Sequence, residues 1–346
     1  MYSPRERLLR TLKKEAVDRP PVISPGGMMN AAVTGVMKKT GNTLPEAHHH
    51  SGLMENLARS VMEETGFENF GLPFCMTIES EALGSEVDYG TLECEPKIAR
   101  EAWRSVTEAA LPSPGAIEKN PRAGAVINSI FALSKKHSGI PAVGCITGPL
   151  STAASLVEPT VFLRELRRER ERAHRLLAGI TRELCRWALL MAENGAAAVT
   201  IADPTATGEI LGPTLFEEYA VRYINEITDA VRRAGTPVII HICGDVRAVK
   251  QHLCHLRGDA ISTDAMVNLA ELKAEYPALV TMGNLSTYLL DTGSENTVRS
   301  GTAALLRRTI DIIAPACGLS TSTPLANLKA FTETVKDFHA TGSISV

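Results

Sequence analysis

One histidine and two cysteines have residue types and positions that would suit a metal site. The stretch VIIHICGDV (238–246) sets His241 and Cys243 two positions apart at the end of an apolar, β-branched run. Side chains at i and i+2 of a strand point to the same face, so both could reach one ion. Cys317 ends a later apolar run and could supply a third ligand. A His/Cys2 set favours zinc, and three protein ligands with an exchangeable fourth position indicate a catalytic ion.

The cysteine content leaves a second interpretation of these residues open. The chain has seven cysteines, scattered and odd in number, which argues against a disulfide framework and predicts reduced thiols. Each thiol is then either a ligand or core filler, since free cysteine is among the most buried residue types. The alternative to a metal site is therefore a hydrogen-bonded core histidine beside two buried cysteines.

Further polar residues follow apolar runs and are candidates for chemistry. Asp203 could lie near the metal and hydrogen-bond the acceptor or a ligand, or it could cap the following helix or turn. Glu79, in MTIESEALG, could be a fourth zinc ligand or a general base, the alternative being a solvated loop. We expect Asp264, Asn284 and Ser320 to contact the substrate.

Several other stretches have simpler interpretations. The triplet His48–His50 is expected at an exposed helix start, with the alternative that one member faces the barrel mouth. Cys254 and His255 are expected at a packed or surface position. Asp245 is expected to be a loop or helix-cap residue. The charge-dense run RELRRERERAHR (164–175) indicates a solvated helix face. The glycines of SPGGMMN (24–30) would allow a tight turn and close approach of substrate.

The elements that must position these residues alternate between apolar β-rich runs and helical patterns. Continuous apolar runs suit a parallel sheet covered on both faces. One or two helices are predicted over 160–194, another over 214–235 and a short one over 267–276. The predicted strands are 20–25, 67–73, 140–147, 196–203, 236–243, 258–265, 278–284 and 310–317.

Eight such units predict a (β/α)8 TIM barrel rather than another α/β layout, and the dinucleotide fingerprint G-x-G-x-x-G is absent. In a barrel, the ends of the strands carrying Asp203, His241, Asp264, Asn284 and Cys317 would meet at the active-site face. We expect a single domain over 1–346. Its first 20 residues would form a helical lead-in, and 26–66 a helical insertion capping the barrel.

The composition excludes several classes of function. The chain has 346 residues, 44% of them apolar, a net charge of −3 and 5% aromatic residues, so a nucleic-acid-binding surface is not indicated. Neither a secretory signal nor an apolar run long enough to span a bilayer is present, and a cytoplasmic protein without membrane contact is expected.

The whole chain resembles the uroporphyrinogen decarboxylase superfamily and, within it, the methylcobamide:coenzyme M methyltransferases and related corrinoid-dependent methyltransferases. The decarboxylase branch fits less well. Its arginine-bearing R-Q-A-G-R-Y segment is replaced by SPGGMMNAAV, and its aspartate-bearing F-S-D-I segment by LPFC (72–75). The resemblance rests on RERLLRTLKKEAVDRPPV (5–22), LPEAH (44–48), LPFCMTIESEALGSEVDYG (72–90), GCITGPLSTAASL (144–156), IADPTATGEILGP (201–213), HICGD (241–245), AISTD (260–264), MGN (282–284) and PACGLSTSTPLANLKAF (315–331).

The methyltransferase branch implies zinc bound by His241, Cys243 and Cys317. The metal would deprotonate a small thiol such as coenzyme M, which would take a methyl group from a methyl-Co(III) corrinoid. No D-x-H-x-x-G cobalt-ligating segment is present, so the resemblance implies a corrinoid protein as partner.

Two other functions stay open at this point. The chain could be the first methyltransferase of a demethylation system, moving methyl from a methoxy, amine or thioether donor to Co(I). It could also be a barrel with a structural metal, or a binding protein. The oligomeric state and the acceptor cannot be read from the residues.

Overall fold

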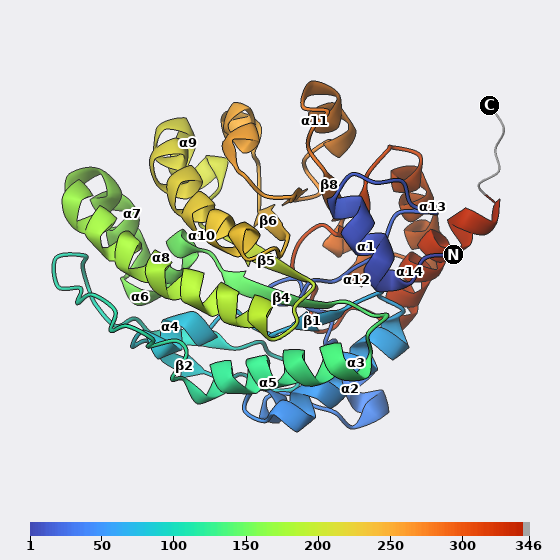
Figure 1. Cartoon of the computed structure of the whole chain (residues 1–346), viewed down its shortest axis with the longest axis horizontal. Coiled ribbons are helices and arrows are strands. Elements are labelled where there is room, and N and C mark those ends of the chain that lie inside the picture. The colour runs from blue at the N-terminus through green and yellow to red at the C-terminus, as the bar shows by residue number, and fades with distance from the viewer. Residues whose placement is uncertain (342–346) are drawn as a thin grey trace.

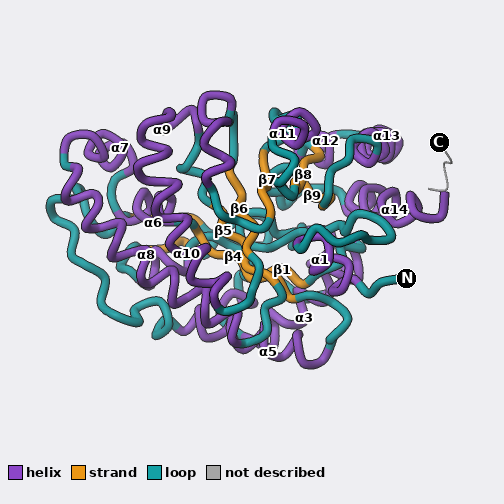
Figure 2. The backbone as a smooth tube through the Cα atoms, turned by 45° about the horizontal axis from the view of Figure 1, so that its top comes forward, coloured by secondary structure: helices purple, strands orange, loops and turns teal. Residues whose placement is uncertain are grey.

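A parallel sheet of seven strands forms the centre of the molecule. The computed structural model describes residues 1–341, so the last five residues of the expected domain lie outside it. Figure 2 shows the strands in the middle with helices around them. In sheet order the strands are β1 (Phe70–Leu72), β4 (Ala142–Thr147), β5 (Ala198–Ala202), β6 (Val238–Ile242), β7 (Ala260–Thr263), β8 (Thr281–Leu285) and β9 (Ile312–Pro315).

The segment at residues 21–24 connects the two edges of this sheet. Val22 forms a parallel bridge with Ile313 of β9, and the Ile23 N–H donates to the Ile313 carbonyl at 3.0 Å. On its other side, the Glu68 N–H donates to the Val22 carbonyl at 2.9 Å. The predicted TIM-type barrel is thereby confirmed. Its first strand is reduced to one bridge because the flanking prolines in PPVISP have no N–H to donate.

The helices lie outside the strands, as Figure 1 shows for α5, α8 and α10. Residues 160–194 form two helices that meet at Glu169, and a six-residue π-helical turn interrupts 208–233.

A short antiparallel pair, β2 (Glu86–Asp88) and β3 (Lys97–Arg100), is separate from the barrel. The helices are α1 (Pro4–Leu12), α2 (Thr34–Thr40), η1 (Glu46–His48), α3 (Ser51–Thr65), α4 (Ile78–Ala82), α5 (Pro121–Lys136), α6 (Pro149–Leu156), α7 (Pro159–Arg168), α8 (Arg170–Glu193), α9 (Gly208–Leu215), η2 (Phe216–Val221), α10 (Arg222–Arg233), η3 (Arg247–His255), α11 (Leu269–Glu275), α12 (Thr287–Thr292), α13 (Glu295–Leu306) and α14 (Leu325–Thr341).

The barrel interior is a small apolar core to which nearly every strand contributes. Because strand side chains alternate between faces, the inward rows can be followed along each strand. Leu8 and Leu12 of α1 join this core, so the N-terminal helix closes one end of the barrel. The interior cluster comprises Leu8, Leu12, Ile23, Met29, Val143, Ala198, Ile239, Ala260, Val280, Met282, Ile312 and Ala314.

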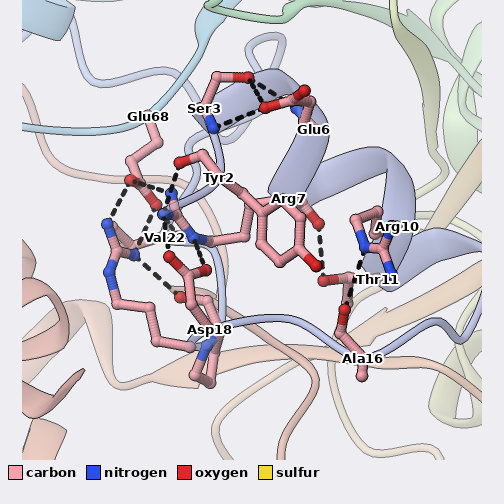
Figure 3. Close-up of polar contacts among 12 residues, drawn as sticks. Tyr2, Ser3, Glu6, Arg7, Arg10, Thr11, Ala16, Asp18, Val22 and Glu68 are labelled. Carbon is pink, nitrogen blue, oxygen red and sulfur yellow. Dashed lines mark hydrogen bonds and ion pairs between the residues drawn. The ribbon is translucent and has the colours of Figure 1, made fainter.

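A buried ion-pair network fastens α1 to the barrel (Figure 3). The Arg7 guanidinium, 2% exposed, donates to Asp18 at 2.7 Å and to Glu68 at 2.9 Å. Arg19 donates to the same Glu68 carboxylate at 2.6 Å. Glu68 precedes β1 and Asp18 precedes Val22, so the network lies where these strands enter the barrel, at the end opposite the expected active-site face.

The segment 26–66 contains α2, η1 and α3. Helix α3 packs against α5 and α14 in the outer layer, and the capping of the barrel mouth by this segment stays a prediction. The expectation of an exposed histidine triplet is wrong for His48, which is 1% exposed, although His49 and His50 are exposed. Burial, with Arg122 nearby, lowers the pKa of His48 to about 3, so it is neutral at ordinary pH.

Candidate metal centre

Strand β6 delivers His241 and Cys243 to the same face of the barrel. All five residues of β6 are buried, and Ile239 faces the interior core. Two-residue alternation continues that inward row through His241 to Cys243, just beyond the last strand residue. Cys317 follows β9 by two residues and is partly exposed. The three candidate ligands therefore lie at the carboxyl ends of two strands.

The structure brings the three ligand atoms together, within 4.8 Å of one another. His241 Nε2 lies 3.1 Å from Cys243 Sγ, and the two sulfur atoms of Cys243 and Cys317 are 3.6 Å apart. Two thiolates on one tetrahedral zinc ion, each at about 2.3 Å, would be about 3.7 Å apart. The sulfur separation and the donor types therefore fit zinc.

The imidazole of His241 is oriented by a serine on the next strand. In the β6–β7 register Ser262 is the partner of His241, and its Oγ lies 2.9 Å from Nδ1. Such a hydrogen bond fixes which ring nitrogen is left to bind a metal, here Nε2. The sequence analysis did not single out Ser262, because only the strand register reveals it.

We expect Ser262→Ala to weaken zinc binding about 10- to 100-fold, the usual effect of removing a partner of a metal-ligating histidine. Competition with a chromophoric chelator measures the affinity. Thr263→Val is the matched control, since Thr263 is equally buried on the same strand but points to the other face. Equal affinities of the Ser262→Ala variant and the wild type would contradict this role.

The contact between the thiols of Cys243 and Cys317 shifts their pKa values in opposite directions. The two sulfur atoms are in contact, and this contact, together with His241, lowers the pKa of Cys317 although burial opposes the shift. The same contact, with burial, raises the pKa of Cys243. Thiolate is the form of cysteine that binds metals, and the direction of the shift at Cys317 favours it.

A glycine-containing turn packs over this cluster. Met28 Sδ lies 4.0 Å from Cys243 Sγ. A Cβ on Gly27 would come within 2.4 Å of Cys145 Sγ, and one on Gly318 within 2.9 Å of the Met28 carbonyl oxygen. The absence of a side chain therefore lets Gly27 pack directly against Cys145 and Gly318 against Met28.

Asp203 is fully buried beside the cluster and holds the start of α6. Its carboxylate accepts from the N–H groups of Leu150 at 3.0 Å and Ser151 at 2.9 Å, and from the Ser151 hydroxyl at 2.6 Å. Burial raises the pKa of Asp203 to about 6, although these hydrogen bonds act to lower it. The carboxylate thus caps α6, which comes earlier in the chain, while the helix that follows Asp203, α9, is capped by Thr207. A role of Asp203 toward the acceptor stays a prediction.

Glu79 and Asn284 have their hydrogen-bonding groups engaged by neighbouring segments. Glu79 accepts from the Thr147 N–H and hydroxyl, both at 2.9 Å, and from Trp187 Nε1 at 3.3 Å, while burial raises its pKa. The Asn284 amide donates to the carbonyls of Asp264 and Val267, each at 2.8 Å. Catalysis by Glu79 and substrate binding by Asn284 stay predictions.

The remaining candidates lie nearer the surface. Asp264 directly follows β7, is partly exposed, and its charge is among those that act on Cys243. Ser320 is exposed and its hydroxyl contacts that of Ser322 at 2.6 Å. Asp245 accepts from the Arg247 N–H at 2.8 Å and lies in the loop before η3, whose N-terminal capping position is Val246. Among the described helices, none has the length and apolar character needed to cross a membrane.

Comparison with known proteins identifies a matching family, related sequences and a similar solved structure. The family model described as uroporphyrinogen decarboxylase (URO-D) matches residues 3–338. Methylcobamide:CoM methyltransferase MtbA of Methanosarcina acetivorans is 28% identical over 339 residues, covering 97% of this chain and 98% of the relative. Methylcobamide:CoM methyltransferase MtaA of Methanosarcina barkeri is 26% identical, covering 98% and 99%. A solved structure, a methyltransferase from Methanosarcina mazei, superimposes with a TM-score of 0.90 at 27% identity, covering 98% of this chain and all of the other.

Proposed function

Since the chain belongs to the uroporphyrinogen decarboxylase (URO-D) family, we propose that it is an enzyme of that family's methyltransferase kind, which moves a methyl group from a methylated corrinoid protein to a small thiol. The observation that carries the proposal is the set of His241, Cys243 and Cys317, whose ligand atoms meet at the strand ends. Whole-length similarity to methylcobamide:CoM methyltransferases supports it, and coenzyme M is the acceptor we propose.

The ligand set explains why a metal would help this reaction. A small thiol has a pKa of about 8.5 or above, so little of it is thiolate at neutral pH. Zinc, when bound, would lower the pKa of an acceptor thiol and hold the sulfur in place. The chain contributes three ligands and thereby leaves a fourth tetrahedral position for that sulfur.

The proposed methyl transfer needs no reactant besides the thiol and the methylated corrinoid. The acceptor sulfur attacks the methyl carbon of the methyl-Co(III) corrinoid, so a carbon–sulfur bond forms and the carbon–cobalt bond breaks. The electron pair of the broken bond stays on cobalt as Co(I), and the thiol proton is released to solvent. Cys317 is partly exposed while His241 is fully buried, so the ligand set is accessible from the strand-end face of the barrel.

Thiol dependence is the experiment that tests this function. We expect methylcobalamin, offered in place of the corrinoid protein, to lose its methyl group only when coenzyme M or another accepted thiol is present. The methyl thioether should appear in equal amount, measured by chromatography alongside cobalamin absorbance. Demethylation that ignores the thiol would contradict the proposal, as would methylation of Co(I)-cobalamin by a methoxy, amine or thioether donor without activity toward thiols.

A further inference from the structure

A second cluster of metal-binding side chains lies on the outer surface, apart from the strand-end site. His252 Nδ1 is 2.7 Å and His255 Nδ1 is 2.9 Å from the same oxygen, Oε2 of Glu217. Together with the strand-end set, it is one of two groups in the described residues whose three ligand atoms lie within 4.8 Å. The side chains of Glu217 and His255 are 44% and 50% exposed, so an ion from solvent could reach them.

Two unusual helical turns bring these side chains together. His252 and His255 belong to the 3-10 helix η3, in which residues three apart are eclipsed, so both imidazoles project from one side. Glu217 belongs to the π-helical turn η2, a rare form found frequently at functional sites. The two turns pack against each other, and the histidine rings meet edge to face at 5.6 Å.

The donor set has the chemistry of a divalent cation site. Two histidines and a glutamate form the protein ligand set of a known class of zinc sites, with a fourth position open to water. On a tetrahedral zinc ion, nitrogen and oxygen ligands at about 2.0–2.2 Å would be about 3.4 Å apart. The present separations of 2.7 and 2.9 Å need to open only slightly, which exposed side chains can do.

We propose that Glu217, His252 and His255 form a second metal site, which takes one borderline divalent cation such as zinc through Nδ1 of each histidine. The cation would take the place of the hydrogen that lies between each histidine Nδ1 and Glu217 Oε2. Each neutral imidazole would then carry its proton on Nε2. The Gln251 side chain, 3.3 Å from His252 Nε2, can accept that hydrogen through its amide oxygen after a flip of the amide.

A cation bound by Glu217, His252 and His255 would connect two segments that are distant in the sequence. Helix η3 begins four residues after Cys243, and Glu217 lies in the turn that precedes α10. A bound ion would link this turn to the segment that leaves the strand-end site. The inference is independent of the methyl-transfer reaction, because none of its three ligands belongs to the strand-end set.

Zinc titration with the full-length protein tests the site. We expect about two zinc equivalents for the wild type, measured by equilibrium dialysis and elemental analysis. His255→Ala and Glu217→Gln should each retain one equivalent, and Cys317→Ser should retain the other. The matched control is Cys254→Ser, which alters an exposed neighbour in the same 3-10 helix and should retain both.

Three results would overturn the proposal. They are a Cys317→Ser protein that holds no zinc, a His255→Ala protein that keeps every zinc equivalent of the wild type, and loss of an equivalent in Cys254→Ser. Circular dichroism of each variant establishes that it is folded, and because His255 is half-exposed, its replacement should leave the fold intact. Loss of the strand-end zinc alone would affect the proposed function and leave this second site standing.

Discussion

Replacing Cys317 with serine should remove the strand-end zinc and reduce methyl transfer by about 10³-fold or more, equal to about 4 kcal/mol. In the proposed site Cys317 would supply one of two thiolates, and its sulfur lies 3.6 Å from that of Cys243. A serine hydroxyl stays protonated at neutral pH and is a poor zinc ligand. The remaining histidine and cysteine would then leave the ion weakly held and the acceptor thiol largely protonated.

The measurement is metal content by elemental analysis together with the initial rate of methylcobalamin demethylation. Cys254→Ser is the matched control, because Cys254 is an exposed cysteine outside the strand-end set and its loss should leave the rate unchanged. A Cys317→Ser protein that kept both its strand-end zinc and its rate would show that Cys317 is a core residue with no metal role.

Replacing Arg7 with methionine should lower the free energy of unfolding by about 3–5 kcal/mol at pH 7. The change leaves the largely buried Asp18 without the cation that lies 2.7 Å away, and leaves Glu68 paired with Arg19 alone. Arg7 also lowers the pKa of Asp18, chiefly through their hydrogen bond. A carboxyl group with a lowered pKa stabilises the fold above its unfolded pKa of about 3.9, and this contribution is lost as the pH falls.

Urea unfolding at pH 7 and pH 3 measures both effects. The difference between wild type and Arg7→Met should be large at pH 7 and smaller at pH 3. Arg10→Met, in the same helix, is the control, because its pairing with Glu15 is exposed and should contribute less than about 1 kcal/mol. Equal destabilisation by the two variants would show that the buried network contributes no more than a surface ion pair.

The barrel was predictable from sequence because its strands are continuous apolar runs. β5 and β6, for example, lie inside the predicted runs 196–203 and 236–243. The length of the first strand was harder to predict. The apolar pattern of PPVISP indicates a full strand, but its prolines limit it to one bridge. One or two helices are predicted over 160–194, and the structure has two, α7 and α8, which meet at Glu169 within the charged run 164–175.

The candidate site was predictable only where local spacing determines geometry. The two-residue spacing of His241 and Cys243 fixes their common face, so their meeting could be foreseen. Ser262 and Met28 contact the cluster from other segments, and no spacing reveals such contacts. His48 shows the opposite problem: its neighbours in the triplet are exposed, but tertiary packing buries it. His255, expected to be an ordinary surface or packing residue, meets Glu217 through the π-helical turn.

X-ray absorption at the zinc edge tests the central claim most directly, that His241, Cys243 and Cys317 hold an ion that binds the acceptor thiol. The His255→Ala protein is the sample, because it keeps the strand-end ligands and lacks one ligand of the surface cluster. We predict two sulfur ligands at about 2.3 Å with nitrogen or oxygen completing the shell, and a third sulfur after coenzyme M is added. A shell of nitrogen and oxygen alone, or one that the thiol leaves unchanged, would contradict the account.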